Sequence, residues 1–446
     1  MGQYVISGRI PLRGSVAVNG AKNSALGIIA AAIMCNEDVT IRNMPDVSDI
    51  RVMLNAIETI GAQVTYPDEN DRHVVVINGS RIINKPIDQK VVAGIRASYY
   101  LIGALLGKYK EASVAEPEGC GIGDKDKGGK RPTDLHEYGF RRLGAMVWKS
   151  DDFINARGMS DRLVGNRIDL AITSVGATIN IMLAASMAEG RTEISNAACE
   201  PHVVDIANFL NCLGAKIRGA GTNVIRIDGV PELKPRKPVD YEIIPDQIEA
   251  GTFMCAAAAT MGDVKITHVI PQHLRVISDK LADMGAIITE GEDFVRVQAN
   301  KRLQPTKIRT EKYPGFPTDM QSQMTACLAI ANGNSKVKET VWENRFEYTE
   351  ELKKMGADIQ VRDREALIVG QEKLHGARVR ATDLRAGAAL VIAGLAAHGI
   401  TYVEEIKYIQ RGYEDFEGKI KALGGKILMT EFIGDVDIEA TIKVHS

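Results

Sequence analysis

The sequence predicts an α/β protein of two domains, each made of three copies of a unit of about 70 residues. Three observations predict it. A helix that ends at a glycine recurs six times, a second helix that is apolar on all sides also recurs six times, and stretches of alternating polarity typical of strands follow both helices. At 446 residues the chain also exceeds the usual size of one hydrophobic core.

The first repeated helix is amphipathic and stops at a glycine that follows a large apolar residue. Glycine suits the position just past a helix because it adopts the left-handed conformation without steric cost. Ahead of one such stop, Val203, Ile206 and Leu210 recur at helical spacing, which predicts one buried face. The six glycines are separated by 83, 70, 71, 71 and 68 residues and are Gly61, Gly144, Gly214, Gly285, Gly356 and Gly424.

The second repeated helix is rich in alanine and glycine and is apolar around most of its circumference, which is typical of a buried helix. The six stretches begin at Ser24, Ser98, Ala177, Thr252, Gln323 and Gly387. Six such units divide into two domains of three, which we place at residues 22–244 and at residues 1–21 together with 245–446. We expect the first 20 or so residues to pair with the C-terminal half, because a closed set of six units needs them there.

Composition excludes several classes of protein. The formal net charge is −2, with 55 basic and 57 acidic residues, which argues against a general nucleic-acid binder. No apolar run is long enough to cross a membrane, and the start of the sequence lacks the apolar region of a signal peptide. The six cysteines form no CxxC pair or zinc-like spacing. We therefore expect a cytoplasmic protein with free thiols and no membrane partner; the sequence does not predict an oligomeric state.

One unit departs from the repeat through a longer loop. From the end of the buried helix to the next glycine stop there are 37 residues in the second unit (107 to 144) and 23–25 in four others. The extra segment holds Cys120 between two glycines, and four Lys or Arg residues lie within 125–131. Loops longer than the local norm are disproportionately functional, and nearby cations lower the pKa of a thiol. Cys120 is therefore a candidate reactive thiol, and an incidental exposed thiol is the alternative.

Charged and polar residues stand at the starts of the buried helices, where free N–H groups and the helix dipole favour anions. Lys22 and Arg96 are cations at an end that disfavours them, which indicates an anionic ligand. Asp319 is either a helix cap or a general base. The other residues at these starts are Asn23, Ser174, Val175, Gly176, Glu249, Asp383 and Arg385, among which capping is an equal interpretation for Glu249 and Asp383. His136 lies near the long loop, and a structural role is the favoured interpretation for it.

These stretches resemble the UDP-N-acetylglucosamine 1-carboxyvinyltransferases, a family of enolpyruvyl transferases. The matching motifs run through the whole chain in family order: Gly20-AKNSAL, Ile95-RAS, Gly119-CGIG, Arg131-PTDLH, Ser174-VGAT, Glu200-PHVVDIANFL, Phe316-PTDMQSQ, Glu343-NRF, Ala381-TDLRA and Arg411-GYE. The resemblance implies two inside-out α/β domains of three units each, with the active site in the cleft between the domains. It implies transfer of the enolpyruvyl group of phosphoenolpyruvate to the 3-hydroxyl of UDP-N-acetylglucosamine, the first committed step of peptidoglycan synthesis.

The resemblance also implies the roles of individual residues. Cys120 would be a general acid that can hold phosphoenolpyruvate covalently and is alkylated by fosfomycin, and Asp319 would take the proton of the sugar hydroxyl. Phosphoenolpyruvate would be bound by Lys22, Asn23, Arg131 and Arg411. The UDP-sugar would be bound by Arg96, Arg131, Pro132, Thr133, Asp134, Leu135, Ser174, Val175, Gly176, Asp319 and Val341. Glu200, Asp383 and Arg385 would support these groups, and the scheme requires no metal ion or other cofactor.

Two departures from the family pattern leave the acceptor open. The loop after Cys120 looks about six residues longer than is usual, and Ile172 stands where many members have lysine. An enolpyruvyl transferase for another nucleotide acceptor, such as UMP, is therefore one alternative. A catalytically silent regulatory paralogue is another. The relative that accepts a shikimate is less favoured, because its arginine- and lysine-rich motifs are not evident, and an RNA-processing cyclase fits the balanced charge poorly.

Overall fold

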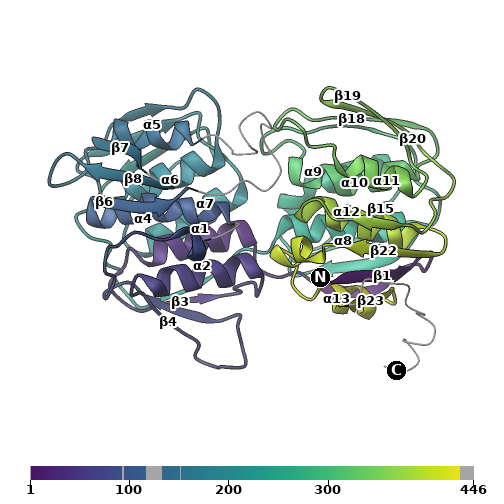
Figure 1. Cartoon of the computed structure of the whole chain (residues 1–446), viewed down its shortest axis with the longest axis horizontal. Coiled ribbons are helices and arrows are strands. Elements are labelled where there is room, and N and C mark those ends of the chain that lie inside the picture. Colours follow the sequence, from purple (N-terminus) through teal and green to yellow (C-terminus); the bar gives the residue numbers. More distant parts are fainter. Residues whose placement is uncertain (1, 93–94, 117–132, 151, 432–446) are drawn as a thin grey trace. The chain divides into compact units, whose positions relative to one another are not determined.

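A computed structural model describes residues 2–92, 95–116, 133–150 and 152–431 (Figure 1). The described chain forms two compact units. Unit A comprises the described residues of 20–244, and unit B comprises those of 1–19 and of 245–431. In these ranges no helix combines the length and the apolar character needed to cross a bilayer.

Unit A holds three small sheets, with strand orders β13-β3-β5-β4, β6-β8-β7 and β11-β12-β10-β9. Its strands are β3 (Val39–Arg42), β4 (Gln63–Thr65), β5 (Val75–Asn78), β6 (Glu111–Ala115), β7 (Ala145–Ser150), β8 (Phe153–Gly158), β9 (Arg167–Asp169), β10 (Arg191–Ser195), β11 (Ile217–Arg218), β12 (Val224–Asp228) and β13 (Val239–Glu242). Its helices are α1 (Lys22–Ala32), α2 (Ser48–Thr59), α3 (Gln89–Val92), the 3-10 turn η1 (Arg96–Tyr99), α4 (Tyr100–Tyr109), α5 (Asp134–Arg142), α6 (Val175–Ala185) and α7 (Pro201–Cys212).

Unit B also holds three sheets, with orders β21-β22-β1-β23, β15-β16-β14-β2 and β17-β18-β20-β19. Its strands are β1 (Gln3–Ser7), β2 (Arg13–Ala17), β14 (Asp263–Thr267), β15 (Ile287–Glu290), β16 (Phe294–Gln298), β17 (Lys307–Arg309), β18 (Asn334–Lys338), β19 (Asp358–Arg362), β20 (Glu365–Val369), β21 (Arg378–Arg380), β22 (Ile400–Glu404) and β23 (Lys426–Thr430). Its helices are α8 (Gln247–Ala259), α9 (Pro271–Asp283), η3 (Thr318–Met320), α10 (Gln321–Ala329), α11 (Tyr348–Lys354), α12 (Leu384–Ala396), η4 (Ile406–Arg411) and α13 (Phe416–Ala422).

Each sheet repeats one pairing scheme. In the third sheet of unit A, β9 precedes the buried helix α6 in the sequence and β10 follows it, and the two strands pair in parallel. Strand β12 then pairs antiparallel with β10, and β11 pairs antiparallel with β12. In the sheet of β6 the parallel strand is reduced to a single bridge between Ile87 and Val114. The six-fold repeat and the α/β fold class predicted from the sequence are thereby confirmed.

Three sheets are completed by segments that lie far away in the sequence. Strand β1 pairs with both β22 and β23, so that Gln3 faces Glu404 on one side and Thr430 on the other. In Figure 1 the purple β1 accordingly lies next to the yellow-green β22. Strand β2 pairs in parallel with β14, and β13 pairs in parallel with β3. The chain therefore starts in unit B, passes through unit A, and returns.

The six glycine stops end the outer helices α2, α5, α7, α9, α11 and α13. Each helix ends two residues before its glycine, and all six glycines have positive φ, between 83° and 102°. Only glycine takes this conformation freely, which explains why the residue recurs.

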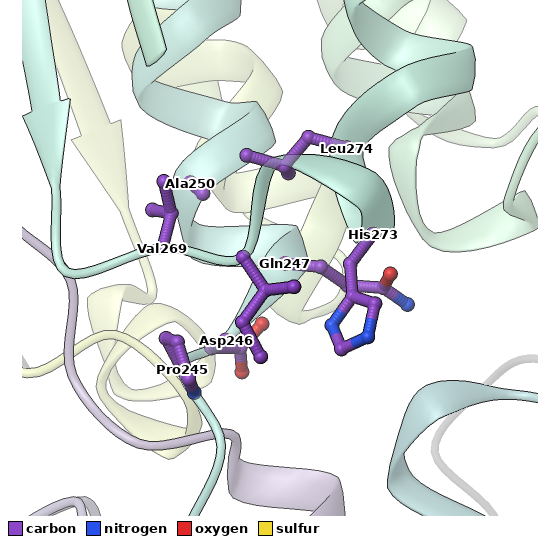
Figure 2. Close-up of a pocket in the computed structure, with 8 residues that line it drawn as sticks. Pro245, Asp246, Gln247, Ala250, Val269, His273 and Leu274 are labelled. Atoms are coloured by element: carbon purple, nitrogen blue, oxygen red, sulfur yellow. The ribbon is translucent and has the colours of Figure 1, made fainter. Parts of the chain in front are cut away.

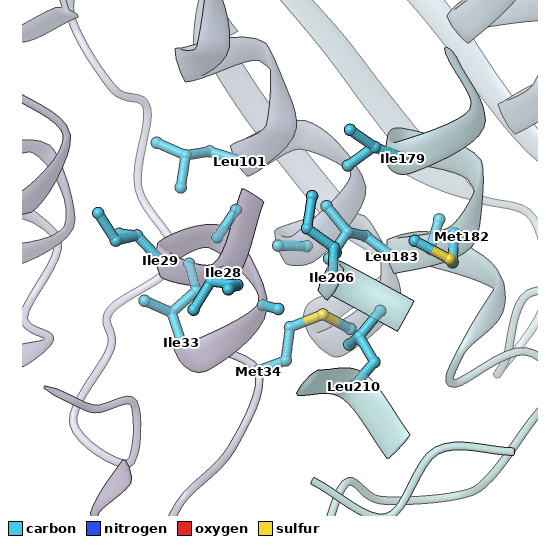
Figure 3. Close-up of a cluster of buried hydrophobic side chains, with 14 of the residues drawn as sticks. Ile28, Ile29, Ile33, Met34, Leu101, Ile179, Met182, Leu183, Ile206 and Leu210 are labelled. Atoms are coloured by element: carbon cyan, nitrogen blue, oxygen red, sulfur yellow. The ribbon is translucent and has the colours of Figure 1, made fainter. Parts of the chain in front are cut away.

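The core of unit A forms where the apolar helices meet. Figure 3 shows Ile28 and Ile29 of α1, and Met34 just beyond its end, near side chains of α4, α6 and α7. A Cβ on Gly27 would stand 2.2 Å from Cδ1 of Ile206 on α7, so the missing side chain allows the close approach of the two helices. The buried helices thus bring their first residues, where the predicted site residues stand, to fixed positions in the unit.

A further repeated device was not predicted. The residue after the strand that follows the buried helix is left-handed in four sheets, at Asn43, Asn196, His268 and Glu405, with φ of 56° to 59°. Asn43 and Asn196 donate through Nδ2 to the carbonyls of Ile243 and Leu170, and the His268 ring bonds the Val18 carbonyl, each at 2.9 Å. These bonds anchor the segments that lead into α8, α6 and α1.

Candidate active site

Lys22 is the first residue of α1 and is buried. Its Nζ donates to Oδ2 of Asp49 on α2 at 2.9 Å, and both side chains are about nine-tenths buried. Asn23 follows and is half-buried. The sequence indicated that an anionic ligand would balance the charge of Lys22. Asp49 balances part of that charge within the protein. It escaped prediction because it lies 27 residues away on another helix.

A second group of predicted residues gathers around His136 on α5. Tyr99, in the turn that begins with Arg96, packs edge-on against the imidazole with ring centroids 4.7 Å apart. Helix α6 begins beside the same ring, since a Cβ on Gly176 would lie 2.9 Å from its Cε1. The predicted residues on the segments that meet there are Arg96, Thr133, Asp134, Leu135, Ser174, Val175 and Gly176.

His136 has the surroundings of a structural residue, which is the interpretation that the sequence analysis favoured, and its imidazole is uncharged. Asn180 of α6 lies with Nδ2 2.9 Å from Nδ1 of His136, so Nδ1 accepts and the ring proton is on Nε2. Burial and, to a smaller extent, the charge of Arg96 together lower the pKa of His136 to about 3. The imidazole therefore orients the surrounding backbone without carrying charge at neutral pH.

Two predicted binding residues, Ser174 and Thr133, also form hydrogen bonds within their own helices. Ser174 caps α6, since its side chain accepts from the N–H of Ala177 at 3.3 Å. Thr133 is buried and donates its hydroxyl to Oε1 of Glu137 at 3.0 Å. Asp134 is exposed and Leu135 is half-buried at the start of α5. The predicted residues Cys120, Arg131 and Pro132 lie outside the described residues.

Asp319 lies in η3 of unit B and is held by two buried arginines. Arg345 Nη2 donates to Oδ1 at 2.8 Å, and Arg385 donates through Nη2 and Nε to Oδ2 at 3.2 and 3.3 Å. The guanidinium side chains are 7% and 6% exposed, whereas that of Asp319 is 31% exposed. Pro317 and Met320 stand at the N-cap positions of η3 and α10 and make no side-chain cap bond, and the cap and base interpretations of Asp319 both stay predictions. The carboxylate is thus fixed by cations yet open on one side.

Arg385 connects Asp319 to the core of unit B. Its Nη1 donates to the hydroxyl oxygen of Tyr413 at 3.3 Å, and that hydroxyl pairs with Thr252 of α8 at 2.8 Å. Burial acts to lower the pKa of Arg385, but the nearby Tyr413, Asp319 and Asp246 raise it overall. Asp383 is a helix cap, since its Oδ1 accepts from the N–H groups of Arg385 and Ala386 at 2.8 and 3.0 Å.

Val341 follows a buried carboxylate that was not predicted. Val341 is exposed, and its N–H donates to Oε1 of Glu339 at 2.8 Å. Glu339 is 1% exposed and lies one residue beyond β18. The sequence around Glu339 does not indicate its role, because its hydrogen-bond partners come from three separate segments.

The two remaining predicted residues have less defined surroundings. Arg411 is the last residue of η4 and is half-buried. Glu200 immediately precedes α7, and its Oε2 is buried without a hydrogen-bond partner among the described residues.

A shallow pocket lies at the starts of α8 and α9 (Figure 2). Asp246 caps α8 there, accepting from the N–H groups of Ile248 and Glu249. The capping interpretation of Glu249 is therefore wrong: its Oε1 instead pairs with Lys419 at 2.6 Å. None of the residues predicted to bind a substrate lines this pocket, which has the residues Pro245, Asp246, Gln247, Ala250, Val269, Ile270, His273 and Leu274 around it.

Comparison with known proteins decides the family. The model of the EPSP synthase (3-phosphoshikimate 1-carboxyvinyltransferase) family matches residues 6–420. The chain is 49% identical over 428 residues to UDP-N-acetylglucosamine 1-carboxyvinyltransferase 2 of Clostridium acetobutylicum, covering 96% of this chain and 99% of that one. It is 46% identical over 435 residues to UDP-N-acetylglucosamine 1-carboxyvinyltransferase 2 of Bacillus subtilis, covering 97% and 98%. The chain belongs to the EPSP synthase family of carboxyvinyltransferases.

Solved structures agree with this membership. The enolpyruvyl transferase NikO from Streptomyces tendae superposes with a TM-score of 0.84 at 28% identity, covering 96% of this transferase and 99% of NikO. EPSP synthase from Acinetobacter baumannii superposes with a TM-score of 0.72 at 18% identity, covering 97% and 100%, which shows the shared fold. The transferase class predicted from the sequence is confirmed. Among the described residues no cluster of three or more His, Cys, Asp and Glu could hold a metal ion.

Proposed function

We propose that this transferase moves the enolpyruvyl group of phosphoenolpyruvate to the 3-hydroxyl of UDP-N-acetylglucosamine, releasing phosphate, as the first committed step of peptidoglycan synthesis in the cytoplasm. The observation that carries the proposal is the near-full-length identity of 46–49% to relatives that are named for this acceptor. Both substrates are small anions, and the predicted binding residues include the cations Lys22, Arg96 and Arg411.

The chemistry proposed is addition followed by elimination. Cys120 protonates the methylene carbon of phosphoenolpyruvate, which makes C2 electrophilic, and the sugar oxygen attacks C2 while its proton passes to Asp319. Loss of a proton from the new methyl group and departure of phosphate restore the double bond. The geometry supports the role of Asp319, because two arginines fix both carboxylate oxygens while the side chain remains 31% exposed.

The remaining predicted residues would hold the substrates. Lys22, Asn23, Arg131 and Arg411 would surround phosphoenolpyruvate. The residues proposed for the UDP-sugar gather largely on the segments that surround His136, which gives them a rigid support. Val341 is the remaining residue proposed for the UDP-sugar.

Phosphate release tests the proposal. The protein is incubated with phosphoenolpyruvate and, separately, UDP-N-acetylglucosamine, UMP or shikimate 3-phosphate. We expect rapid release of inorganic phosphate with UDP-N-acetylglucosamine and little with the other two acceptors. Release that depends on UMP alone would instead assign another acceptor, and the absence of release with every acceptor would indicate a silent paralogue.

A further inference from the structure

Glu339 is a fully buried carboxylate that accepts four hydrogen bonds. Oε1 accepts from Thr310 Oγ1 at 2.7 Å and from the N–H groups of Val341 and Trp342 at 2.8 and 3.1 Å. Oε2 accepts from Thr318 Oγ1 at 2.8 Å. An ionised carboxylate accepts only, so all four donors fit its charged form. Bonds to a charged acceptor are about twice as strong as neutral ones, which makes Glu339 a strong local anchor.

The four bonds join three segments that surround Asp319. Thr310 follows β17, Thr318 opens η3 directly before Asp319, and Val341 with Trp342 forms the loop after β18. The same loop also supplies Arg345, which bonds the Asp319 carboxylate at 2.8 Å. The segment of Glu339 to Arg345 is therefore bonded to the Asp319 turn at two points. Glu339 accepts from Thr318, the residue before Asp319, and Arg345 donates to the Asp319 carboxylate.

The residue at this place after the strand differs among the six sheets. It is Asn43, Asn196 or His268 in three of them, each of which bonds one main-chain carbonyl, and a glutamate in the others, namely Glu116, Glu339 and Glu405. Glu116 pairs with Lys149 at 2.8 Å and Glu405 pairs with Lys407 at 2.7 Å, whereas Glu339 accepts from two hydroxyls and two N–H groups. The bond from Thr318 connects the start of η3 to this carboxylate.

We propose that Glu339 is a positioning residue for the transfer reaction, which orients the Asp319 carboxylate through Thr318 and shapes the Val341 loop. This inference rests on the proposed function only for the role of Asp319. It predicts that the bond to Thr318 matters for turnover, whereas the bond to Thr310 matters for stability alone.

A matched pair of substitutions tests this division. Thr318→Val removes only the link between Glu339 and the Asp319 turn. Thr310→Val removes the link to β17 and also the acceptor of the Thr340 N–H at 2.9 Å, so it costs more stability. We expect Thr318→Val to lower kcat about tenfold, with KM for both substrates within about threefold, and Thr318→Ser to restore kcat. Thr310→Val should lower the melting temperature further but leave kcat within about twofold.

Hydrogen exchange provides a readout that does not depend on activity. In Thr318→Val the backbone amides of residues 318–321 should exchange faster than in the wild type, and in Thr310→Val they should not. Equal kcat in the two variants, or unchanged exchange at residues 318–321 in Thr318→Val, would overturn the role of Glu339. Failure of the proposed function would appear separately, as a wild-type protein that releases no phosphate.

Discussion

One buried amide connects three helices beneath the predicted binding segments. Asn180 of α6 accepts from the N–H of Gly103 on α4 through Oδ1, and its Nδ2 donates to the Tyr99 carbonyl and to His136 on α5, all at 2.9 Å. Every polar atom of this amide is satisfied, and a network of this kind fixes a unique packing. The neutral state of His136 is part of that network, because a protonated ring could not accept from Asn180.

Stability should therefore depend on pH through His136. Its folded pKa of about 3 lies below the ordinary value of 6.5, so the unfolded chain takes up the proton more readily. The contribution of His136 is complete above about pH 6.5 and is lost as the pH falls from there towards 3. We expect the urea midpoint to fall between pH 7 and pH 4.5 more steeply in the wild type than in His136→Gln. Equal slopes in the two proteins would contradict this account.

Asp319→Asn should affect both turnover and stability. Loss of the proposed base should lower kcat by at least about 10²-fold in the phosphate-release assay. The substitution also removes the counter-charge of two buried arginines, so the melting temperature should fall as well. A variant with kcat within about threefold of the wild type would show that Asp319 only anchors Arg345 and Arg385.

The sequence predicted those site residues whose position is set locally. Lys22 and Ser174 stand at helix starts, which are visible in the pattern of apolar residues. Asp49, Arg345 and Glu339 escaped prediction because each acts on a residue 20 or more positions away, and a long-range ion pair leaves no periodic trace.

At the scale of the helix, the glycine stops were predictable and the left-handed residues after the strands were not. Glycine is the residue of least cost at positive φ, so its recurrence indicates the conformation. At Asn43, Asn196 and His268 the same conformation is supported by a side-chain bond to a distant carbonyl. That bond exists only once the sheet has formed.

The stops should differ in their tolerance of a side chain. A Cβ on Gly214 would stand 2.7 Å from the carbonyl oxygen of Lys234, whereas a Cβ on Gly144, in the same unit, would have nothing within 4 Å. Gly144→Ala should cost about 1 kcal/mol of unfolding free energy through its positive φ. Gly214→Ala should cost at least about 1 kcal/mol more because of the backbone clash. Equal losses in urea unfolding would contradict this account.

At the scale of the molecule, the repeat predicts six sheets but not which strands complete them. Alternating polarity specifies the face of a strand and leaves its partner open. Strand β1 fills the gap between β22 and β23, where Val5 and Ile6 are fully buried. Sheet closure in unit B therefore depends on residues that are more than 390 positions apart.

Removal of residues 1–8 should open this sheet selectively. Strand β23 would lose its neighbour in the sheet and β22 would keep only β21, so the amides that bond β1, within residues 400–404 and 426–430, should exchange much faster. Strands β10 and β12 of unit A keep all their partners and serve as the internal control. Unchanged exchange at β22 and β23 would mean that another segment replaces β1.

The position of β1 also sets an order of events during protein synthesis. A ribosome adds about 5–20 residues per second, so roughly 20–80 s separate the appearance of β1 from that of β23. For most of this interval, until β22 has been made, the strand Gln3–Ser7, which carries Val5 and Ile6, has neither of its neighbours. All strands of unit A lie between residues 39 and 242, so unit A can fold while the rest is still being made. The sheet of β1 in unit B can close only after translation has reached β23.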